Sequence, residues 1–161
     1  MANFRYSHLF TTKIGNAAFQ RCTGLKEIDM PELTTISGYA FGECTGLTHI
    51  VLPKVTGHSN YAFDRCTNLK IVDYGILKEL YTRLFQNCNS FDTLILRSTS
   101  LCVCRGTDSF TNTPFAGYNG LTGTVYVPAA LVESYKTATN WSTMYAAGTC
   151  NFVAIEGSEY E

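Results

Sequence analysis

Residues 36–53 read ISGYAFGECTGLTHIVLP, and shorter versions of this phrase return along the chain. The part around the cysteine occurs four times, as AFQRCTGL at 18–25, AFGECTGL at 40–47, AFDRCTNL at 62–69 and LFQNCNSF at 84–91. The interval between successive copies is constant, without a gap. Self-similarity at a fixed period of roughly 20–50 residues is typical of repeat proteins, so the chain is predicted to stack one structural unit.

Several columns of residues share this register. They are Phe19, Phe41, Phe63 and Phe85; Cys22, Cys44, Cys66 and Cys88; Leu25, Leu47, Leu69 and Phe91; Ile28, Ile50, Val72 and Leu94; and Met30, Leu52, Tyr74 and Leu96. Each copy ends in a segment of the form L-x-x-I-x-L, whose alternation predicts a short strand with one buried face. Stacked copies would place these strands side by side, about 4.8 Å apart, in a parallel sheet. One copy cannot bury its apolar side alone, so neighbouring copies must cover it.

The spacing becomes irregular after residue 100. The interval from Leu96 to Val127 is longer than the interval from Tyr74 to Leu96, so residues 101–128 are predicted to form an irregular fifth repeat with a surface loop inserted at 98–123. Leu131, Tyr135 and Ala138 lie at i, i+4 and i+7, the spacing of one apolar helix face. Residues 129–161 are therefore predicted to form a C-terminal helix–strand cap, and residues 1–13 an N-terminal arm or degenerate cap.

The pattern I-x-x-x-A-F-x-x-C-x-x-L-x-x-I-x-L-P is complete from Ile36 to Pro53 and nearly so from Ile14 to Pro31. It resembles the BspA-type (Treponema pallidum-type) leucine-rich repeat family over the four repeats of residues 14–100, with departures at His58, Gly75 and Leu84. The tail TVYVPAALVESYKTATNWS resembles the end that follows such repeats in gut-bacterial and prophage proteins. The resemblance implies an α/β repeat: a short right-handed leucine-rich-repeat solenoid with a parallel β-sheet, a period of about 22 residues and the C-terminal cap.

The resemblance also implies a non-catalytic protein-binding or adhesion module of a bacterial surface protein, located outside the cell or on its surface. The alternative is an accessory structural or receptor-binding component of a bacteriophage particle, in the tail or as a capsid decoration. The partner is then a protein or glycan on a host or bacterial surface, or a neighbouring virion subunit. The start, MANFRYSHLFTTK, has no apolar stretch long enough for a signal peptide, which favours the virion alternative.

Composition and motifs exclude several other classes of function. The net charge is −1 and the 12 Lys and Arg residues are scattered, so no nucleic-acid partner is expected. No apolar run approaches the length that a membrane-spanning helix needs, so no membrane insertion is expected. No G-x-S-x-G, H-E-x-x-H, P-loop or G-x-G-x-x-G motif is present, so the chain is not expected to be an enzyme or to bind a cofactor.

Seven cysteines cannot all pair within one chain. The four column cysteines are predicted to be small buried side chains without bridges, because equivalent side chains of stacked copies point the same way. They lie along a line, whereas zinc needs ligands that converge on a point, so no metal site is expected. Cys102 and Cys104 are predicted to be exposed thiols in the inserted loop. Trp141 is predicted to pack under the cap helix.

The candidate binding residues are the strand positions that alternate with the core columns and vary between copies. Repeat proteins use such a face as a continuous binding surface. The inserted loop offers a second set of candidates, because long loops often have functional roles. The strand candidates are Glu27, His49, Ile71 and Thr93 in one stripe and Asp29, Val51, Asp73 and Ile95 in the next, and the loop candidates are Phe110, Phe115 and Tyr118.

Overall fold

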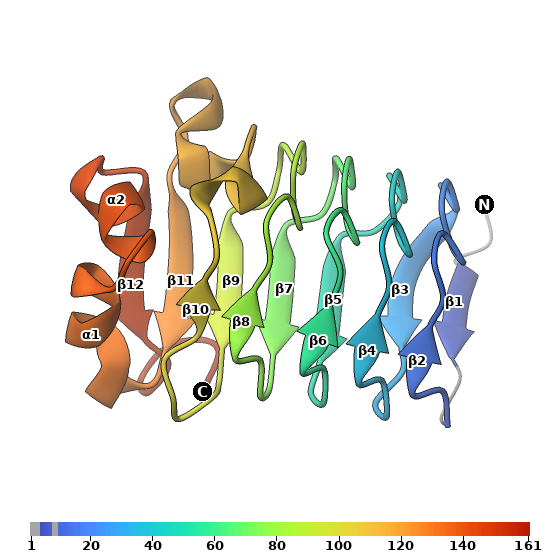
Figure 1. The fold of residues 1–161 in the computed structure, drawn as a ribbon, viewed down its shortest axis with the longest axis horizontal. Coiled ribbons are helices and arrows are strands. Elements are labelled where there is room, and N and C mark those ends of the chain that lie inside the picture. The colour runs from blue at the N-terminus through green and yellow to red at the C-terminus, as the bar shows by residue number, and fades with distance from the viewer. Residues whose placement is uncertain (1–3, 8–9) are drawn as a thin grey trace.

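The structure is a computed structural model that describes residues 4–7 and 10–161. Figure 1 shows a row of stacked coils that runs from the N-terminal end (blue) to the C-terminal end (red). Each of the regular coils has one long strand on one side of the molecule and one short strand on the other. Parallel strands with few helices confirm the α/β repeat class and the predicted parallel sheet.

The long strands form one main sheet and a separate pair. The main sheet has the order β12-β11-β9-β7-β5, and β1 pairs with β3 beside it. Among the described residues no ladder joins β3 to β5. The bounds are β1 Phe4–Ser7, β3 Leu25–Asp29, β5 His49–Leu52, β7 Ile71–Tyr74, β9 Thr93–Leu96, β11 Gly123–Val127 and β12 Cys150–Ala154.

The short strands lie on the opposite side of the core (Figure 1). They pair in the orders β2-β4-β6 and β10-β8, all in parallel. Their bounds are β2 Lys13–Ile14, β4 Thr35–Ile36, β6 Gly57–His58, β8 Glu79–Leu80 and β10 Val103–Cys104. Of the predicted N-terminal arm, Phe4–Ser7 pairs with β3 and Lys13–Ile14 belongs to this side, while residues 1–3 and 8–9 lie outside the described part.

Pairing between long strands follows the repeat of the sequence. Ile50 lies opposite Val72, and Val72 lies opposite Leu94, so each residue meets its equivalent in the next copy. Leu94 then lies opposite Val125, across the longer interval of the irregular repeat. This longer connection contains three short 3₁₀ turns: η1 Thr107–Phe110, η2 Pro114–Ala116 and η3 Tyr118–Gly120.

The AF-x-x-C segments form the turns that lead into the long strands. In the second copy Tyr39 and Glu43 have left-handed backbones, with φ of 53° and 59°. Residues at the same two positions of the neighbouring copies share this conformation. It turns the adjoining peptide groups toward the next coil: the Phe41 N–H donates to the carbonyl of Ala62 at 2.9 Å, and the Glu43 N–H to that of Asp64 at 2.7 Å. The turns thus satisfy their backbone groups between coils, as the strands do.

The phenylalanine column forms the centre of the core. Phe19, Phe41, Phe63 and Phe85 stack with ring centroids 5.4–5.5 Å apart. Phe41, Phe63 and Phe85 are fully buried. Offset stacking at this separation is favourable for aromatic rings beyond the burial of their surface, so the column ties consecutive coils together.

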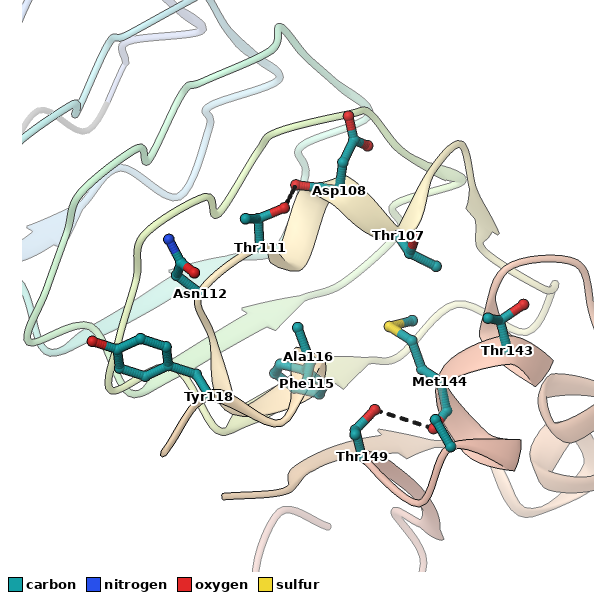
Figure 2. A pocket seen from close by; sticks show the side chains of 11 residues that line it. Thr107, Asp108, Thr111, Asn112, Phe115, Ala116, Tyr118, Thr143, Met144 and Thr149 are labelled. Carbon is teal, nitrogen blue, oxygen red and sulfur yellow. Dashed lines mark hydrogen bonds between the residues drawn. The ribbon is translucent and has the colours of Figure 1, made fainter. Parts of the chain in front are cut away.

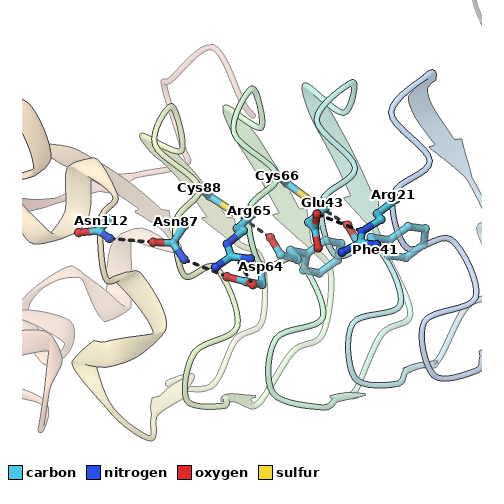
Figure 3. Close-up of polar contacts among 10 residues, drawn as sticks. Arg21, Phe41, Glu43, Asp64, Arg65, Cys66, Asn87, Cys88 and Asn112 are labelled. Carbon is cyan, nitrogen blue, oxygen red and sulfur yellow. Dashed lines mark hydrogen bonds and ion pairs between the residues drawn. The ribbon is translucent and has the colours of Figure 1, made fainter.

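The cysteine column lies beside this stack, as Figure 3 shows for Cys66 and Cys88. All seven cysteines are free thiols. The thiol of Cys44 donates to the carbonyl of Phe19 at 2.9 Å, and Cys66 and Cys88 make the same bond to the preceding coil at 3.0 Å. These three cysteines are buried as predicted. For Cys22 the prediction of burial is wrong: its side chain is exposed, because no equivalent turn precedes the first copy.

The prediction that Cys102 and Cys104 are exposed is also wrong, and both are buried. Cys104 belongs to β10, and Cys102 directly precedes this strand. Because β10 pairs with β8, the segment does not lie in a surface loop. Side chains of the C-terminal region bond to this segment: Trp141 Nε1 donates to the Cys102 carbonyl at 2.8 Å, and Asn140 Nδ2 to the Cys104 carbonyl at 2.7 Å. Burial raises the pKa of the Cys104 thiol to about 11 and that of Cys102 further.

The C-terminal region covers the last coil. The predicted helix is shorter than its apolar pattern: a 3₁₀ turn, η4 Ala129–Leu131, leads into α1 Val132–Thr137, and a second helix, α2 Trp141–Ala146, follows. Ala138 has ψ of 145°, an extended conformation that ends α1. Trp141 is buried against Tyr135 and Phe152, which agrees with its predicted packing. Within the described part of the chain, no helix is both long and apolar enough to cross a bilayer.

Candidate binding surface

The outward face of the long-strand sheet, here called the outer face, holds the predicted strand candidates. On β3 and β5 the side chains of Glu27, Asp29, His49 and Val51 are exposed. The reason is the alternation of the strands: in β5, Ile50 and Leu52 point into the core, so His49 and Val51 point away from it. On β7 and β9, Ile71 and Thr93 are half-buried.

The four exposed residues surround one hollow. It has a volume of about 440 Å³ and lies where β3 and β5 run side by side without a hydrogen-bond ladder. Ile28 and Thr48 complete its lining. The structure therefore brings together two carboxylates, an imidazole and an apolar valine from two neighbouring coils.

In the middle of the outer face the predicted exposure of Asp73 is wrong, since its residue exposure is only 8%. Arg97, which follows β9, binds its carboxylate in a fork: Nε lies 2.9 Å from Oδ1 and Nη2 lies 2.9 Å from Oδ2. The hydrogen bonds that Arg97 donates to Asp73 raise the pKa of the Arg97 guanidinium. Such a bidentate pair holds both side chains in a fixed geometry. The pairing of Arg97 with Asp73 was not predicted from the sequence. The repeat did show that Arg97 directly follows a long strand, where its side chain is close to the neighbouring strand.

The predicted exposure of Ile95 is wrong as well, because its exposure is only 1%. Its cross-strand neighbours on the same face are Asp73 on β7 and Tyr126 on β11. Tyr160 packs edge-on against Tyr126, with ring centroids 4.6 Å apart, and also reaches the side chain of Thr93. Tyr160, which follows β12 in the chain, thus lies against the outer face at β9 and β11.

This C-terminal segment, residues 155–161, is held by its own hydrogen bonds. The Ala129 N–H donates to Glu156 Oε2 at 2.8 Å, and the Ser158 hydroxyl donates to the Ile155 carbonyl at 2.6 Å. Figure 1 shows the chain turning back from β12 toward the middle of the stack. The outer face therefore presents its strand side chains openly on β3 and β5 and again at Asn151 and Val153 of β12, whereas Asp73 and Ile95 in its middle are buried.

Of the loop candidates, Phe110 and Phe115 are fully buried, so neither ring is open to a binding partner. Phe110 extends the aromatic column, with its centroid 6.2 Å from that of Phe85, and Phe115 lies 4.9 Å from Phe110. Tyr118 is half-buried. Since Phe110 stands at the position of the AF phenylalanine, the column itself was the signal that placed this ring in the core.

Polar side chains also join the turns along one edge of the stack (Figure 3). Asn112 Nδ2 donates to Asn87 Oδ1 at 2.7 Å, and Asn87 Nδ2 donates to Asp64 Oδ1 at 3.1 Å. Burial raises the pKa of Asp64, and the bond from Asn87 acts against that rise. Further along the edge, Arg21 Nε lies 3.2 Å from Glu43 Oε2. These bonds link successive coils and leave the carboxylates occupied with structural partners.

Among the residues that the structure describes, no group of three or more His, Cys, Asp or Glu side chains is placed to hold a metal ion. His58, the departure from the isoleucine column, is buried instead of lying in any site. Neither of its ring nitrogens has a hydrogen-bond partner in the described structure. The outer face has exposed charged, polar and apolar side chains that a partner could contact.

The comparison with protein families gives one match. The model of the BspA type leucine-rich repeat region matches residues 10–119, in six copies. No curated protein and no solved structure matches the chain. The match spans more than half of the 161 residues and includes the AF-x-x-C turns and the long strands described above. The chain therefore belongs to the BspA-type leucine-rich-repeat family.

Proposed function

We propose that this protein is a non-catalytic binding module that recognises a protein or glycan partner through the N-terminal half of its outer face. The observation that supports this most is the hollow of about 440 Å³ between β3 and β5, lined by Glu27, Asp29, His49 and Val51. In the middle of the same face Asp73 and Ile95 are buried, and Tyr160 packs against Tyr126. A stacked repeat presents its sheet as an extended binding surface, and the hollow lies in an open part of that surface.

The side chains that line the hollow limit the kind of partner that fits it. Glu27, Asp29 and His49 make the lining polar, and Val51 adds exposed apolar area. A partner with hydrogen-bonding groups beside a small apolar group would complement this lining, because complementary polar groups across an interface fix its register. The fit to such a partner requires no bond-breaking chemistry from the protein.

As part of the same proposal, we infer a location outside the cell or on its surface, and a right-handed solenoid of regular coils that residues 129–161 close. Packing supports the closing role: Tyr135, Trp141 and Phe152 are buried against one another at the end of the stack. A covered end prevents the last strand from pairing with another chain, which is the usual requirement of a repeat array.

A matched pair of valine variants tests the proposed surface. Val51 on the outer face and Val103 on the short-strand side are exposed to 46% and 44%. Fluorescently labelled protein should bind intact bacterial or epithelial cells in flow cytometry, Val51→Arg should weaken that binding, and Val103→Arg should not. Equal loss in both variants, or no binding to any cell, would contradict the proposal. Co-assembly with phage tail or capsid subunits instead would favour a virion component.

A further inference from the structure

The regular period ends at the inserted turns, and a pocket of about 640 Å³ lies there between these turns and α2 (Figure 2). One wall is built by η1–η3, and the other by α2 and the residues after it. The volume lies within the range of about 300–1,000 Å³ that is usual for small-ligand sites. The pocket lies apart from the hollow of the outer face and shares no lining residue with it.

The floor of the pocket is apolar and rigidly held. Phe115 and Met144 are both buried, and Phe115 packs against Phe91 and Phe110 with centroids 5.1 and 4.9 Å away. Gly123 makes room for this ring, since a Cβ there would lie 2.3 Å from Phe115 Cδ1. In Figure 2 the side chains of Ala116 and Met144 project into the open space above the floor. These buried side chains fix the base of the pocket, and a ligand would meet the exposed methyl groups of Ala116 and Ala147.

The rim is polar, and three of its side chains already donate hydrogen bonds within the protein. The Thr111 hydroxyl donates to the Asp108 carbonyl at 3.1 Å, and the Thr149 hydroxyl donates to the Met144 carbonyl at 3.2 Å. The Asn112 amide nitrogen donates to Asn87. Each of these three side chains keeps an oxygen that accepts hydrogen bonds. A ligand that binds here therefore finds acceptors for its own hydrogen-bond donors.

Charge excludes the common ionic ligands. Asp108 is the only charged residue of the lining, and its Oδ2 already lies 3.4 Å from Arg83 Nε. Phosphate or sulfate would find no cationic side chain in the lining, and a metal ion would find one paired carboxylate. A wholly apolar ligand would remove water from the threonine and asparagine oxygens without replacing their hydrogen bonds, which is unfavourable.

We propose that this pocket binds a neutral sugar ring. A pyranose has an apolar face of C–H groups, which would lie against the exposed methyl groups of Ala116 and Ala147 above the buried Phe115 and Met144. Its hydroxyl groups both donate and accept, so they match the rim oxygens of Thr111, Asn112 and Thr149. The hydroxyl of Thr143 on α2 adds a further polar contact from the other wall. This site is independent of the outer face, and the protein would then have two binding surfaces with different ligand chemistry.

Saturation-transfer NMR with the methyl glycosides of glucose, galactose, mannose and N-acetylglucosamine tests the proposal on the full chain. At least one glycoside should receive saturation from the unchanged protein. Ala116→Trp, which fills the pocket, should abolish the signal, whereas Ala130→Trp, at an exposed position of η4 outside the pocket, should keep it. Thr143→Val preserves the shape of the side chain and should reduce the signal by removing one hydroxyl.

Three results would overturn the proposal. The first is no transfer to any of the four glycosides, and the second is an unchanged signal in Ala116→Trp. The third is loss of the signal in Val51→Arg, which would place the sugars on the outer face. An unchanged circular dichroism spectrum must first show that the Ala116→Trp protein is folded. If Ala116→Trp does not fold, an unchanged signal in Thr143→Val would overturn the proposal instead.

Discussion

The thiol of Cys66 donates a hydrogen bond to the carbonyl oxygen of Phe41, 3.0 Å away and one coil earlier in the chain. The bond joins the turn of one coil to the turn of the coil before it. The same bond recurs at Cys44 and Cys88, so the column of cysteines connects neighbouring turns in one direction. The first copy has no such neighbour, and its cysteine remains at the surface.

This arrangement predicts how the thiols react. With Ellman's reagent under native conditions, Cys22 should react rapidly and the six buried cysteines only after unfolding. Burial limits access and also raises the pKa of the Cys44 and Cys150 thiols to about 12, so almost no reactive thiolate is present at neutral pH. Cys22→Ser should remove the fast phase and Cys150→Ser should not. A fast phase of several thiols in the native protein would contradict this burial.

The aromatic column predicts a gradient of stability effects. Phe41→Ala should lower the free energy of unfolding by about 3–5 kcal/mol, the usual cost of removing a core aromatic ring. Phe19→Ala should cost less, because Phe19 at the end of the stack is only half-buried. Phe10→Ala, at a side chain that is 85% exposed, serves as the control and should change little. Urea denaturation of the three variants measures the order, and a cost below about 1 kcal/mol at Phe41 would place it outside the core.

The contact of Tyr160 with Tyr126 on the outer face predicts that Tyr160 contributes to stability. Tyr160→Ala should lower the free energy of unfolding by about 0.5–1.5 kcal/mol, because it removes the edge-on contact with Tyr126. It should also raise the binding of a hydrophobic dye such as ANS, since the surface around Ile95 becomes more accessible. Glu159→Ala, at the exposed neighbouring position, should change neither measurement. Identical behaviour of the two variants would show that the segment does not cover the face.

His58 predicts a dependence of stability on pH. Burial without a hydrogen-bond partner lowers its pKa from 6.5 to about 4, and its ring neighbours Tyr74 and Tyr81 supply no charge at acidic pH. The folded state thus keeps the imidazole neutral, while the unfolded chain binds a proton below pH 6.5. Stability from this residue is fully present above pH 6.5, falls as the pH drops toward 4, and levels off below that value.

A substitution isolates this effect. His58→Ile restores the residue type of Ile14 and Ile36 in the same column. The difference in unfolding free energy between the variant and the unchanged protein should grow by roughly 1.4 kcal/mol for each pH unit between 6 and 4.5. Urea denaturation at a series of pH values measures it. Parallel pH profiles of the two proteins would mean that His58 does not remain neutral in the folded state.

Much of the core was predictable from the columns of the sequence. Phe41, Cys44, Leu47, Ile50 and Leu52 repeat at equal spacing, and each is buried. Exposure on the outer face was less predictable. Alternation correctly placed Glu27, Asp29, His49 and Val51 at the surface, but the same alternation failed at Asp73 and Ile95, whose neighbours differ from those of the first coils.

The sequence by itself determined the repeat, its parallel strands and most of its core, because residues at a constant period occupy equivalent positions in every coil and need the same packing. Only the tertiary structure decided which part of the outer face is open and how the insertion is used. Tyr126, which lies beside Ile95 on the sheet, packs against Tyr160 from the end of the chain, and the pocket joins Ala116 to Met144 across two elements. Such contacts depend on how the last part of the chain folds back, and no local pattern encodes them.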